Sequence, residues 1–200
     1  AAQGLVGRIE KSGLPLTRIE TKDHRAAIIV DGAVLRLTDG LPATLRGVQD
    51  QHALVLYDLC LDYGEAKRIA VAASDKADPS ARLAAIGFFQ ALGFRVSDID
   101  DVPGLVVMRT LAMLVNEAMD AVQARIASPE AIDLAMTKGV NYPRGPLAWG
   151  QAVGYAQILA VLDNLARVYG EDRYRASPWL RRVVAAHAAA EAAGSSEEIP

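Results

Sequence analysis

The chain has a single cysteine, Cys60, among its 200 residues, so it cannot form an internal disulfide. Its 21 basic and 24 acidic residues give a net charge of -3 without a long run of one sign. That balance argues against a nucleic-acid-binding surface and against a basic surface that binds membranes. The apolar runs are too short and too interrupted to span a bilayer, and no signal-peptide pattern opens the chain. These absences favour a protein of the reducing cytoplasm whose partners are small molecules or other proteins.

Phosphate-binding and metal-binding motifs are also missing. No GxGxxG follows a predicted strand and no GxxxxGK[ST] occurs, so we expect the chain alone to bind no dinucleotide. The histidines, His24, His52 and His187, belong to no metal-ligand motif. Isolated histidines are more often solvated or hydrogen-bonded than metal-bound, so we expect no metal site.

The first half of the chain has the pattern of an α/β domain, predicted over 1–102. With 52% hydrophobic residues, the chain can bury a core without disulfides or metals. The predicted elements are a helix over 1–12, strands over 16–20, 26–30, 33–37, 54–61 and 68–73, a helix over 78–93 and a strand over 94–99. Asp31-Gly32 is typical of a tight hairpin turn, because this pair tolerates positive φ angles. The strand, helix, strand order of 68–99 predicts a parallel crossover unit.

The second half is predicted to be all helical over 103–193, with a disordered tail over 194–200. The first helix is predicted over about 107–126 and is expected to run over twenty residues. The others are predicted from Ser128-Pro129-Glu130 to Gly139, over 152–169, and from Ser177-Pro178 onward. The segment Tyr142–Pro146 contains two prolines and a glycine, which predict a rigid loop between helices.

Several polar residues stand where either chemistry or structure could use them. Asp58 and Asp62 flank Cys60 after a buried strand, where catalytic groups do occur in α/β sheets, but helix capping or loop solvation is the more common role. Asn116 and Glu117 lie on the long apolar helix. A buried polar side chain there must be hydrogen-bonded, which favours a tether between helices.

The second half also carries five landmarks that, in order and spacing, resemble the C-terminal domain of the NAD-dependent 3-hydroxyacyl-CoA dehydrogenases. They are DVPGLVVMR at 101–109, NEA at 116–118, SPEAID at 128–133 followed by Gly139, YPRGP at 142–146 and RYRASP at 173–178. The resemblance implies a helical bundle of the 6-phosphogluconate dehydrogenase C-terminal-like type, which forms a homodimer and closes over acyl-CoA. The implied acyl-CoA or interface residues are Arg109, Tyr142, Arg144, Gly145 and Pro146.

Residues 68–104 resemble the end of the family's nucleotide-binding domain, but with departures at its catalytic positions. The family's histidine falls near Leu59 and its partner glutamate near Val71, and neither side chain can move a proton. A register shifted by one residue would offer Asp58 or Cys60, which does not restore a His–Glu pair.

The junction before the helical half departs as well. The family's phenylalanine and asparagine are replaced by Leu105 and Met108, while Arg109 is retained. The resemblance therefore implies a partial, degenerate Rossmann-like domain without catalytic or cofactor-binding residues. We expect Arg109 to be held by a carboxylate or by helix carbonyls, because a buried guanidinium cannot be left unpaired.

This combination resembles the second half of the long phenylacetate-catabolism-type enzymes, in which the two-domain unit is duplicated. NAD and hydride transfer would then belong to the preceding copy, and this chain would be inactive alone while supplying dimer surface and acyl-CoA cover. One rival is a structural dimerisation module without ligand contact. A second rival is a separate sugar-acid or hydroxyacid dehydrogenase, which needs a catalytic lysine on the long helix, and Val107 to Ala124 contains none.

Overall fold

The computed structural model describes residues 2–14, 26–50 and 53–194 and divides into two compact units. Unit 1 comprises residues 1–108 and unit 2 residues 109–200. The strand predicted over 16–20 lies outside the described residues, as do His24, His52 and all but the first residue of the tail predicted over 194–200.

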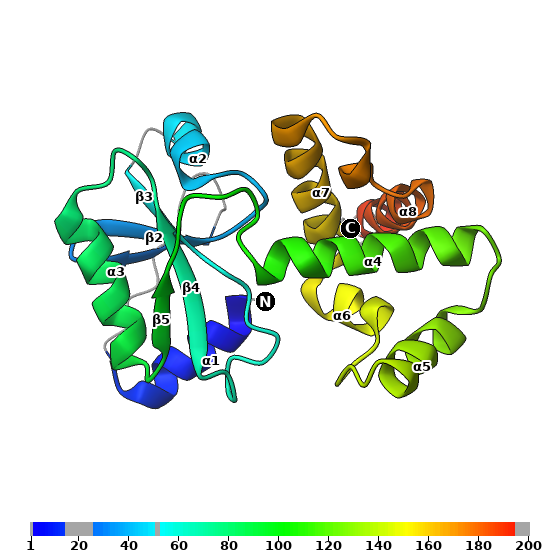
Figure 1. Ribbon diagram of the computed structural model, residues 1–200, viewed down its shortest axis with the longest axis horizontal. Helices are drawn as coiled ribbons and strands as arrows, with labels where there is room; N and C mark the ends of the chain where they lie inside the picture. Colours follow the sequence, from blue (N-terminus) through cyan, green and yellow to red (C-terminus); the bar gives the residue numbers. More distant parts are fainter. Residues whose placement is uncertain (1, 15–25, 51–52, 195–200) are drawn as a thin grey trace, which may run out of the picture. The chain divides into compact units, whose positions relative to one another are not determined.

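Unit 1 is a five-stranded mixed sheet with helices on both faces (Figure 1). The strands lie side by side in chain order, as β1 (Ile28–Val30), β2 (Ala33–Leu37), β3 (Leu54–Tyr57), β4 (Arg68–Ala73) and β5 (Arg95–Asp98). The pairs β2–β3 and β4–β5 are parallel, whereas β1–β2 and β3–β4 are antiparallel. Each parallel pair encloses a crossover helix, α2 (Ala43–Asp50) or α3 (Pro79–Ala91).

Local signals placed most of these elements correctly. The β1–β2 hairpin turns at Asp31 and Gly32, whose φ angles of 47° and 80° are both positive, as a tight turn of this type requires. The predicted crossover unit is present as β4–α3–β5. Asp78 is the N-cap residue of α3 with Pro79 at the first helical position, although the Asp78 side chain makes no cap hydrogen bond. The helix α2 was not predicted.

Both faces of the sheet in unit 1 are covered by apolar side chains. On one face, Leu5 and Ile9 of α1 (Ala2–Ser12) join Phe89 of α3 against Val55 and other strand residues. On the other face, residues of α2, β3 and β4 pack with Leu105. All four residues of β3 are buried, as its nearly continuous apolar run predicts for a strand covered on both sides.

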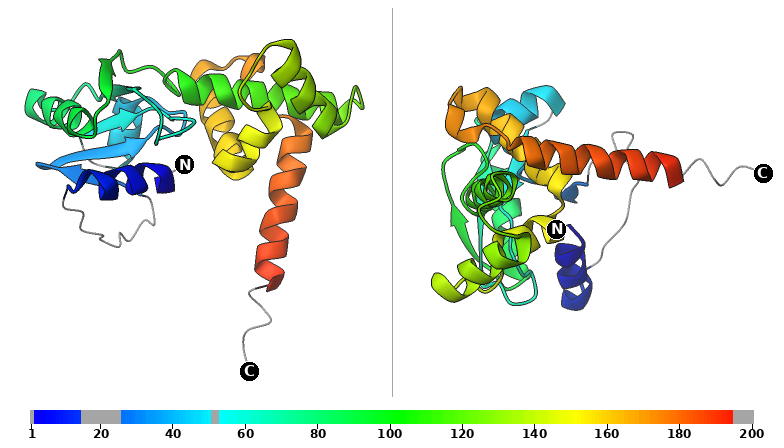
Figure 2. Two further views of the ribbon diagram at one scale, coloured as in Figure 1. Left: turned by 90° about the horizontal axis from the view of Figure 1, so that it is seen from below. Right: turned by 90° about the vertical axis from the view of Figure 1, so that its right-hand side faces the viewer.

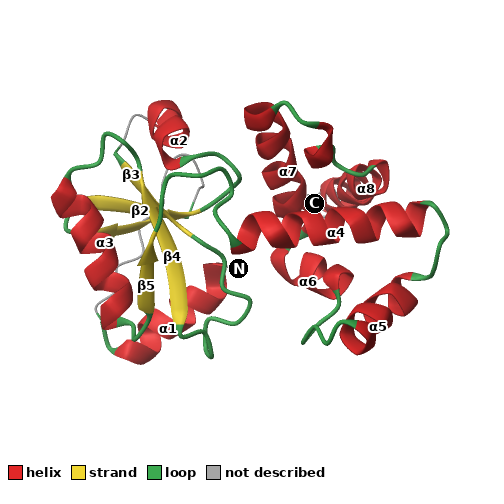
Figure 3. Cartoon of the chain, viewed as in Figure 1, coloured by secondary structure: helices red, strands yellow, loops and turns green. Residues whose placement is uncertain are grey.

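Unit 2 consists of helices, as Figure 3 shows. They are α4 (Val107–Gln123), whose first two residues belong to unit 1, α5 (Pro129–Gly139), α6 (Pro146–Val153), α7 (Tyr155–Tyr169), the short 3-10 helix η1 (Asp172–Tyr174) and α8 (Pro178–Gly194). The caps predicted at Ser128 and Ser177 are confirmed, because their hydroxyl oxygens accept hydrogen bonds from the amides of Ala131 and Trp179. The buried residues of this unit lie mainly on α4, α6 and α7, with Leu180 from α8.

Two helix boundaries differ from the sequence prediction. The helix α4 has 17 residues instead of more than twenty, and the backbone leaves the helical conformation at Arg125, where φ is 55°. The helix predicted over 152–169 begins at Tyr155 as α7, because Gly154, with a φ of 101°, separates it from α6, a helix that was not predicted. The predicted loop over Tyr142–Pro146 therefore ends at Pro146, which is the first residue of α6.

The last helix, α8, packs only its first turns against unit 2. Leu180 is fully buried, whereas residues 185–191 are all exposed. Figure 2 shows α8 projecting away from the other helices of this unit. Within the described part of the chain, no helix is long and apolar enough to cross a membrane.

Candidate functional site

The positions at which the resemblance places the family's catalytic histidine and glutamate carry buried apolar side chains. Leu59 follows β3 and is 2% exposed, and Val71 in β4 is fully buried. Met108, in the place of the family's asparagine, is also fully buried. None of these side chains can accept or donate a proton, so these positions cannot perform acid–base chemistry.

Asp58, next to Leu59, is the cap of a helix. Its carboxylate accepts hydrogen bonds from the amides of Val106 (2.9 Å), Val107 (2.7 Å) and Met108 (3.0 Å), which begin α4. The side chain is buried, and the free amides of a helix N-terminus together with the helix dipole favour a negative charge there. The capping role predicted for Asp58 is confirmed.

Cys60 is the other residue that a shifted register would offer. It is buried, and burial, aided by the nearby negative charge of Asp58, raises the pKa of its thiol to about 11. The thiol is therefore protonated at neutral pH and is a poor nucleophile.

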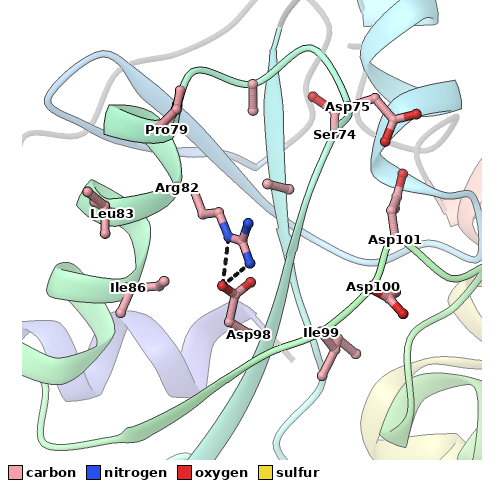
Figure 4. Close-up of a pocket in the computed structure, with 12 residues that line it drawn as sticks. Ser74, Asp75, Pro79, Arg82, Leu83, Ile86, Asp98, Ile99, Asp100 and Asp101 are labelled. Carbon is pink, nitrogen blue, oxygen red and sulfur yellow. Dashed lines mark hydrogen bonds and ion pairs between the residues drawn. The ribbon is translucent and has the colours of Figure 1, made fainter.

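A cleft of about 540 Å³ lies beside the carboxyl ends of β4 and β5 and the first turns of α3 (Figure 4). Its polar lining residues are Ser74, Asp75, Arg82, Asp98, Asp100 and Asp101. The Arg82 guanidinium binds Asp98, with 2.6 Å between Nε and Oδ2, so the cationic side chain is already paired. The cleft is consequently acidic, which disfavours a phosphate-bearing ligand.

In unit 2, the α5–α6 junction is built around Asp133. Its carboxylate accepts hydrogen bonds from the amides of Leu147 (2.8 Å) and Ala148 (2.9 Å) and so caps α6. A Cβ atom at Gly145 would overlap the Asp133 side chain, so only glycine fits there. Nothing in the local sequence marks Asp133 as this cap, because it lies inside the preceding helix, 14 residues from its partner.

The predicted site residues lie in two places of unit 2. Tyr142, Arg144, Gly145 and Pro146 form the α5–α6 junction, where the half-buried Tyr142 ring lies 5.7 Å from that of Trp149. Arg144 is exposed, whereas Gly145 and Pro146 are buried.

Arg109, on α4, contacts the end of α7. Its Nη1 donates a hydrogen bond to the hydroxyl of Tyr169 (3.1 Å), whose ring stacks on that of Tyr174 with 4.9 Å between centroids. The partner is a phenol hydroxyl in place of the carboxylate or helix carbonyl that we expected. A tyrosine brought over by the fold can satisfy a guanidinium N–H as well as a carbonyl can.

Asn116 has the tethering role that its position on an apolar helix predicts. It is 2% exposed, its Nδ2 donates to the Arg175 carbonyl (3.0 Å), and its Oδ1 accepts from the Ser177 amide (2.7 Å). The neighbouring Glu117 is exposed. Asn116 therefore joins α4 to the segment that leads into α8.

Comparison with known proteins matches both units of this chain to one family. Residues 35–103 match the 3-hydroxybutyryl-CoA dehydrogenase reduced Rossmann-fold domain, and residues 104–196 match the 3-hydroxyacyl-CoA dehydrogenase C-terminal domain. This chain belongs to the 3-hydroxyacyl-CoA dehydrogenase family. The fold expected from the resemblance, a partial Rossmann-like domain followed by a helical domain, is thereby confirmed.

The matches cover only part of each relative. The 3-hydroxyadipyl-CoA dehydrogenase of Escherichia coli strain K12 is 40% identical over 153 residues, which cover 76% of this chain and 31% of the relative. A probable 3-hydroxybutyryl-CoA dehydrogenase of Deinococcus radiodurans is 40% identical over 97 residues, covering 48% of this chain and 35% of the relative. The crystal structure of 3-hydroxybutyryl-CoA dehydrogenase from Escherichia coli K12 superposes with a TM-score of 0.75 at 38% identity, covering 84% of this chain and 34% of that chain. The matched residues make up about a third of each of these relatives.

The family is NAD-dependent, but the residues that begin α2 do not fit the pyrophosphate of a dinucleotide. The loop between β2 and α2 contains one glycine, Gly40, where a dinucleotide-binding loop has three. The amides of Ala43 and Thr44, which begin α2, already bind the carboxylate of Asp101. At the start of α2, next to the acidic cleft beside β4 and β5, these two amides are therefore not free for a pyrophosphate.

Within the described residues, no cluster of three or more histidine, cysteine, aspartate or glutamate side chains could hold a metal ion. His187 is exposed on α8. The candidate site is therefore the helical unit, and chiefly its α5–α6 junction.

Proposed function

We propose that this chain is a non-catalytic C-terminal portion of a longer NAD-dependent 3-hydroxyacyl-CoA dehydrogenase. In that enzyme it supplies homodimer surface and part of the cover over acyl-CoA. One observation carries the proposal: family membership extends over both units, yet the positions of the acid–base pair hold the buried side chains of Leu59 and Val71. A domain without an acid–base pair can still contribute to the enzyme through the surfaces that it presents to a second subunit and to the acyl-CoA.

The parent protein is proposed to be of the long phenylacetate-catabolism type, with the two-domain unit duplicated. Support comes from the E. coli relative, named 3-hydroxyadipyl-CoA dehydrogenase, of which this chain matches only 31%. The preceding copy would bind NAD and oxidise the 3-hydroxyl group of the acyl-CoA. The single thiol and the absence of disulfides suit a cytoplasmic enzyme.

The acyl-CoA cover is assigned to the α5–α6 junction. Gly145 and Pro146 form a rigid entry to α6, locked by the Asp133 cap, and such a loop holds its side chains in place at little entropic cost. Tyr142 offers an aromatic surface, and the exposed Arg144 offers a cation for a phosphate or carboxylate of the ligand. Arg109 binds the Tyr169 hydroxyl and so positions the end of α7 against α4.

The chain alone is expected to bind no NAD and to oxidise no 3-hydroxyacyl-CoA, because it lacks both the phosphate cradle and the acid–base pair. Calorimetric titration with NAD and an absorbance assay for NADH with 3-hydroxybutyryl-CoA measure this. The full-length E. coli relative is the positive control. Micromolar NAD binding by this chain would show that the non-catalytic assignment is wrong.

The acyl-CoA assignment is tested separately, by measuring the affinity of the chain and of its Arg144→Ala variant for butyryl-CoA with calorimetric titration. Loss of one charge-assisted contact of about 1.5 kcal/mol weakens binding roughly tenfold. Arg125→Ala, which removes another exposed arginine of unit 2, is the matched control and should leave the affinity unchanged. If the chain binds no butyryl-CoA at all, the rival reading as a structural dimerisation module is the better one.

A further inference from the structure

The β2–α2–β3 segment has the topology that nucleotide-binding domains use for phosphate. The strands β2 and β3 are parallel neighbours, and α2 connects them after a loop over residues 38–42. In such a unit the helix N-terminus after the first strand is an anion site, because its free amides and the helix dipole both favour negative charge.

That N-terminus is already bound by an anion of the chain itself. The Ala43 amide donates to Asp101 Oδ1 (2.5 Å) and the Thr44 amide donates to Asp101 Oδ2 (2.8 Å). Asp101 lies more than fifty residues further along, after β5, so only the fold brings it there. Its two oxygens engage neighbouring amides, as two oxygens of a phosphate would.

The surroundings of α2 hold this arrangement in place. In the preceding loop, Gly40 is buried with a φ of 99°, and Arg46 of α2 forms an ion pair with Asp39. The Thr44 hydroxyl also accepts a hydrogen bond from the Asp75 amide (2.9 Å), which ties the first turn of α2 to the end of β4. An incoming phosphate would have to displace Asp101 from this framework and would meet the acidic cleft that Asp101 also lines.

We propose that Asp101 is a built-in substitute for the pyrophosphate, whose carboxylate fills the anion site of the β2–α2–β3 unit and closes it to nucleotides. This inference rests on the proposed non-catalytic function and names the residue that occupies the anion site. A carboxylate attached to the same chain remains at the site at any concentration of free ligand. Asp101 thus preserves the fold around α2 while it removes the binding function.

Thermal unfolding of the Asp101→Ala variant, with and without inorganic phosphate, tests the proposal. The variant should unfold several degrees below the unmodified chain, because the amides of Ala43 and Thr44 lose their acceptor. Phosphate at tens of millimolar should restore part of that loss, while the unmodified chain responds to phosphate only as it responds to sodium chloride of equal ionic strength. In the amide NMR spectrum, phosphate should shift the signals of Ala43 and Thr44 in the variant alone.

Two further variants keep the test decisive. Asp133→Ala empties the α6 N-terminus, which lies outside any β–α–β unit, and should gain no comparable rescue by phosphate. Asp101→Asn retains one acceptor oxygen and serves if Asp101→Ala does not fold; it too should be stabilised by phosphate. Absence of rescue in a folded Asp101 variant, or equal rescue of Asp133→Ala, would overturn the proposal. NAD binding by the unmodified chain would overturn both this inference and the proposed function, whereas absence of phosphate rescue overturns the inference alone, so the two failures are distinguishable.

Discussion

Three aspartates, Asp58, Asp101 and Asp133, each bind the amides that begin a helix elsewhere in the chain. Each supplies acceptor oxygens to the first amides of a helix, which have no partner within the helix itself. Asp58 lies next to Leu59, where the resemblance places the family's histidine. Its carboxylate accepts hydrogen bonds from the amides that begin α4 and is therefore not available for acid–base chemistry. The carboxylates of Asp58, Asp101 and Asp133 therefore have structural roles.

Cys60 should react slowly with thiol reagents in the folded chain and rapidly after unfolding. Its pKa is raised from 9.0 to about 11, chiefly by burial, so the fold favours the protonated thiol. A raised pKa adds stability that is fully present below pH 9 and decreases as the pH rises from 9 toward 11. Urea unfolding between pH 7 and pH 11 should therefore show a loss of stability in alkali.

Cys60→Ala is the control for this alkaline loss. Tyr57, whose pKa burial raises to about 12, still contributes to the loss in that variant, so the decline should become shallower between pH 9 and pH 11 without vanishing. A decline of the same steepness with and without the thiol would contradict this account.

At the scale of elements, polar contacts between distant segments join several helices of unit 2. The α5–α6 junction needs Asp133 and the absence of a side chain at Gly145. The Asn116 side chain binds both a carbonyl and an amide just before α8. Such contacts set where helices begin and how they are joined, which apolar packing alone leaves open.

Replacing Asn116 with alanine should destabilise the chain by about 2–3 kcal/mol, because the Arg175 carbonyl and the Ser177 amide both lose their side-chain partner. Urea unfolding at neutral pH measures the change. Glu117→Ala, on the exposed neighbour, should alter stability by less than about 0.5 kcal/mol. Equal losses in the two variants would show that the tether contributes nothing specific.

At the scale of the whole molecule, unit 2 has exposed apolar side chains on and beside α5 and along α8. Ile126, Leu134 and Val140 are 76%, 58% and 54% exposed, α5 has no buried residue, and residues 185–191 of α8 are exposed and mostly alanine. Exposed apolar surface of this kind is typical of an interaction face. It is the surface to which we assign the proposed homodimer.

Sedimentation velocity should accordingly give a dimer. Leu134→Glu places a charge on the exposed face of α5 and should shift the equilibrium toward monomer. Leu83→Glu, at a comparably exposed leucine of α3 in unit 1, is the matched control and should leave the dimer intact. A monomer at all concentrations, or equal disruption by both variants, would remove the helical unit as the dimer surface.

The sequence by itself determined the features that depend on near neighbours. Asp31-Gly32 required a tight hairpin, Ser128 and Ser177 marked helix starts, and the landmarks of the helical half identified the family. The sequence also predicts that the two positions at which the resemblance places the family's catalytic pair are inert, because a leucine or a valine cannot move a proton in any fold.

Only the tertiary structure decided what depends on residues that are distant in the chain. The helix α2 was missed because an eight-residue segment containing a glycine has little helical tendency alone, and its cap, Asp101, follows more than fifty residues later. The partner of Arg109 and the cap of α6 were likewise set by segments that meet only after folding. Local sequence encodes backbone preference over a few residues, whereas a polar side chain takes its partner from whatever the folded chain brings within about 3 Å.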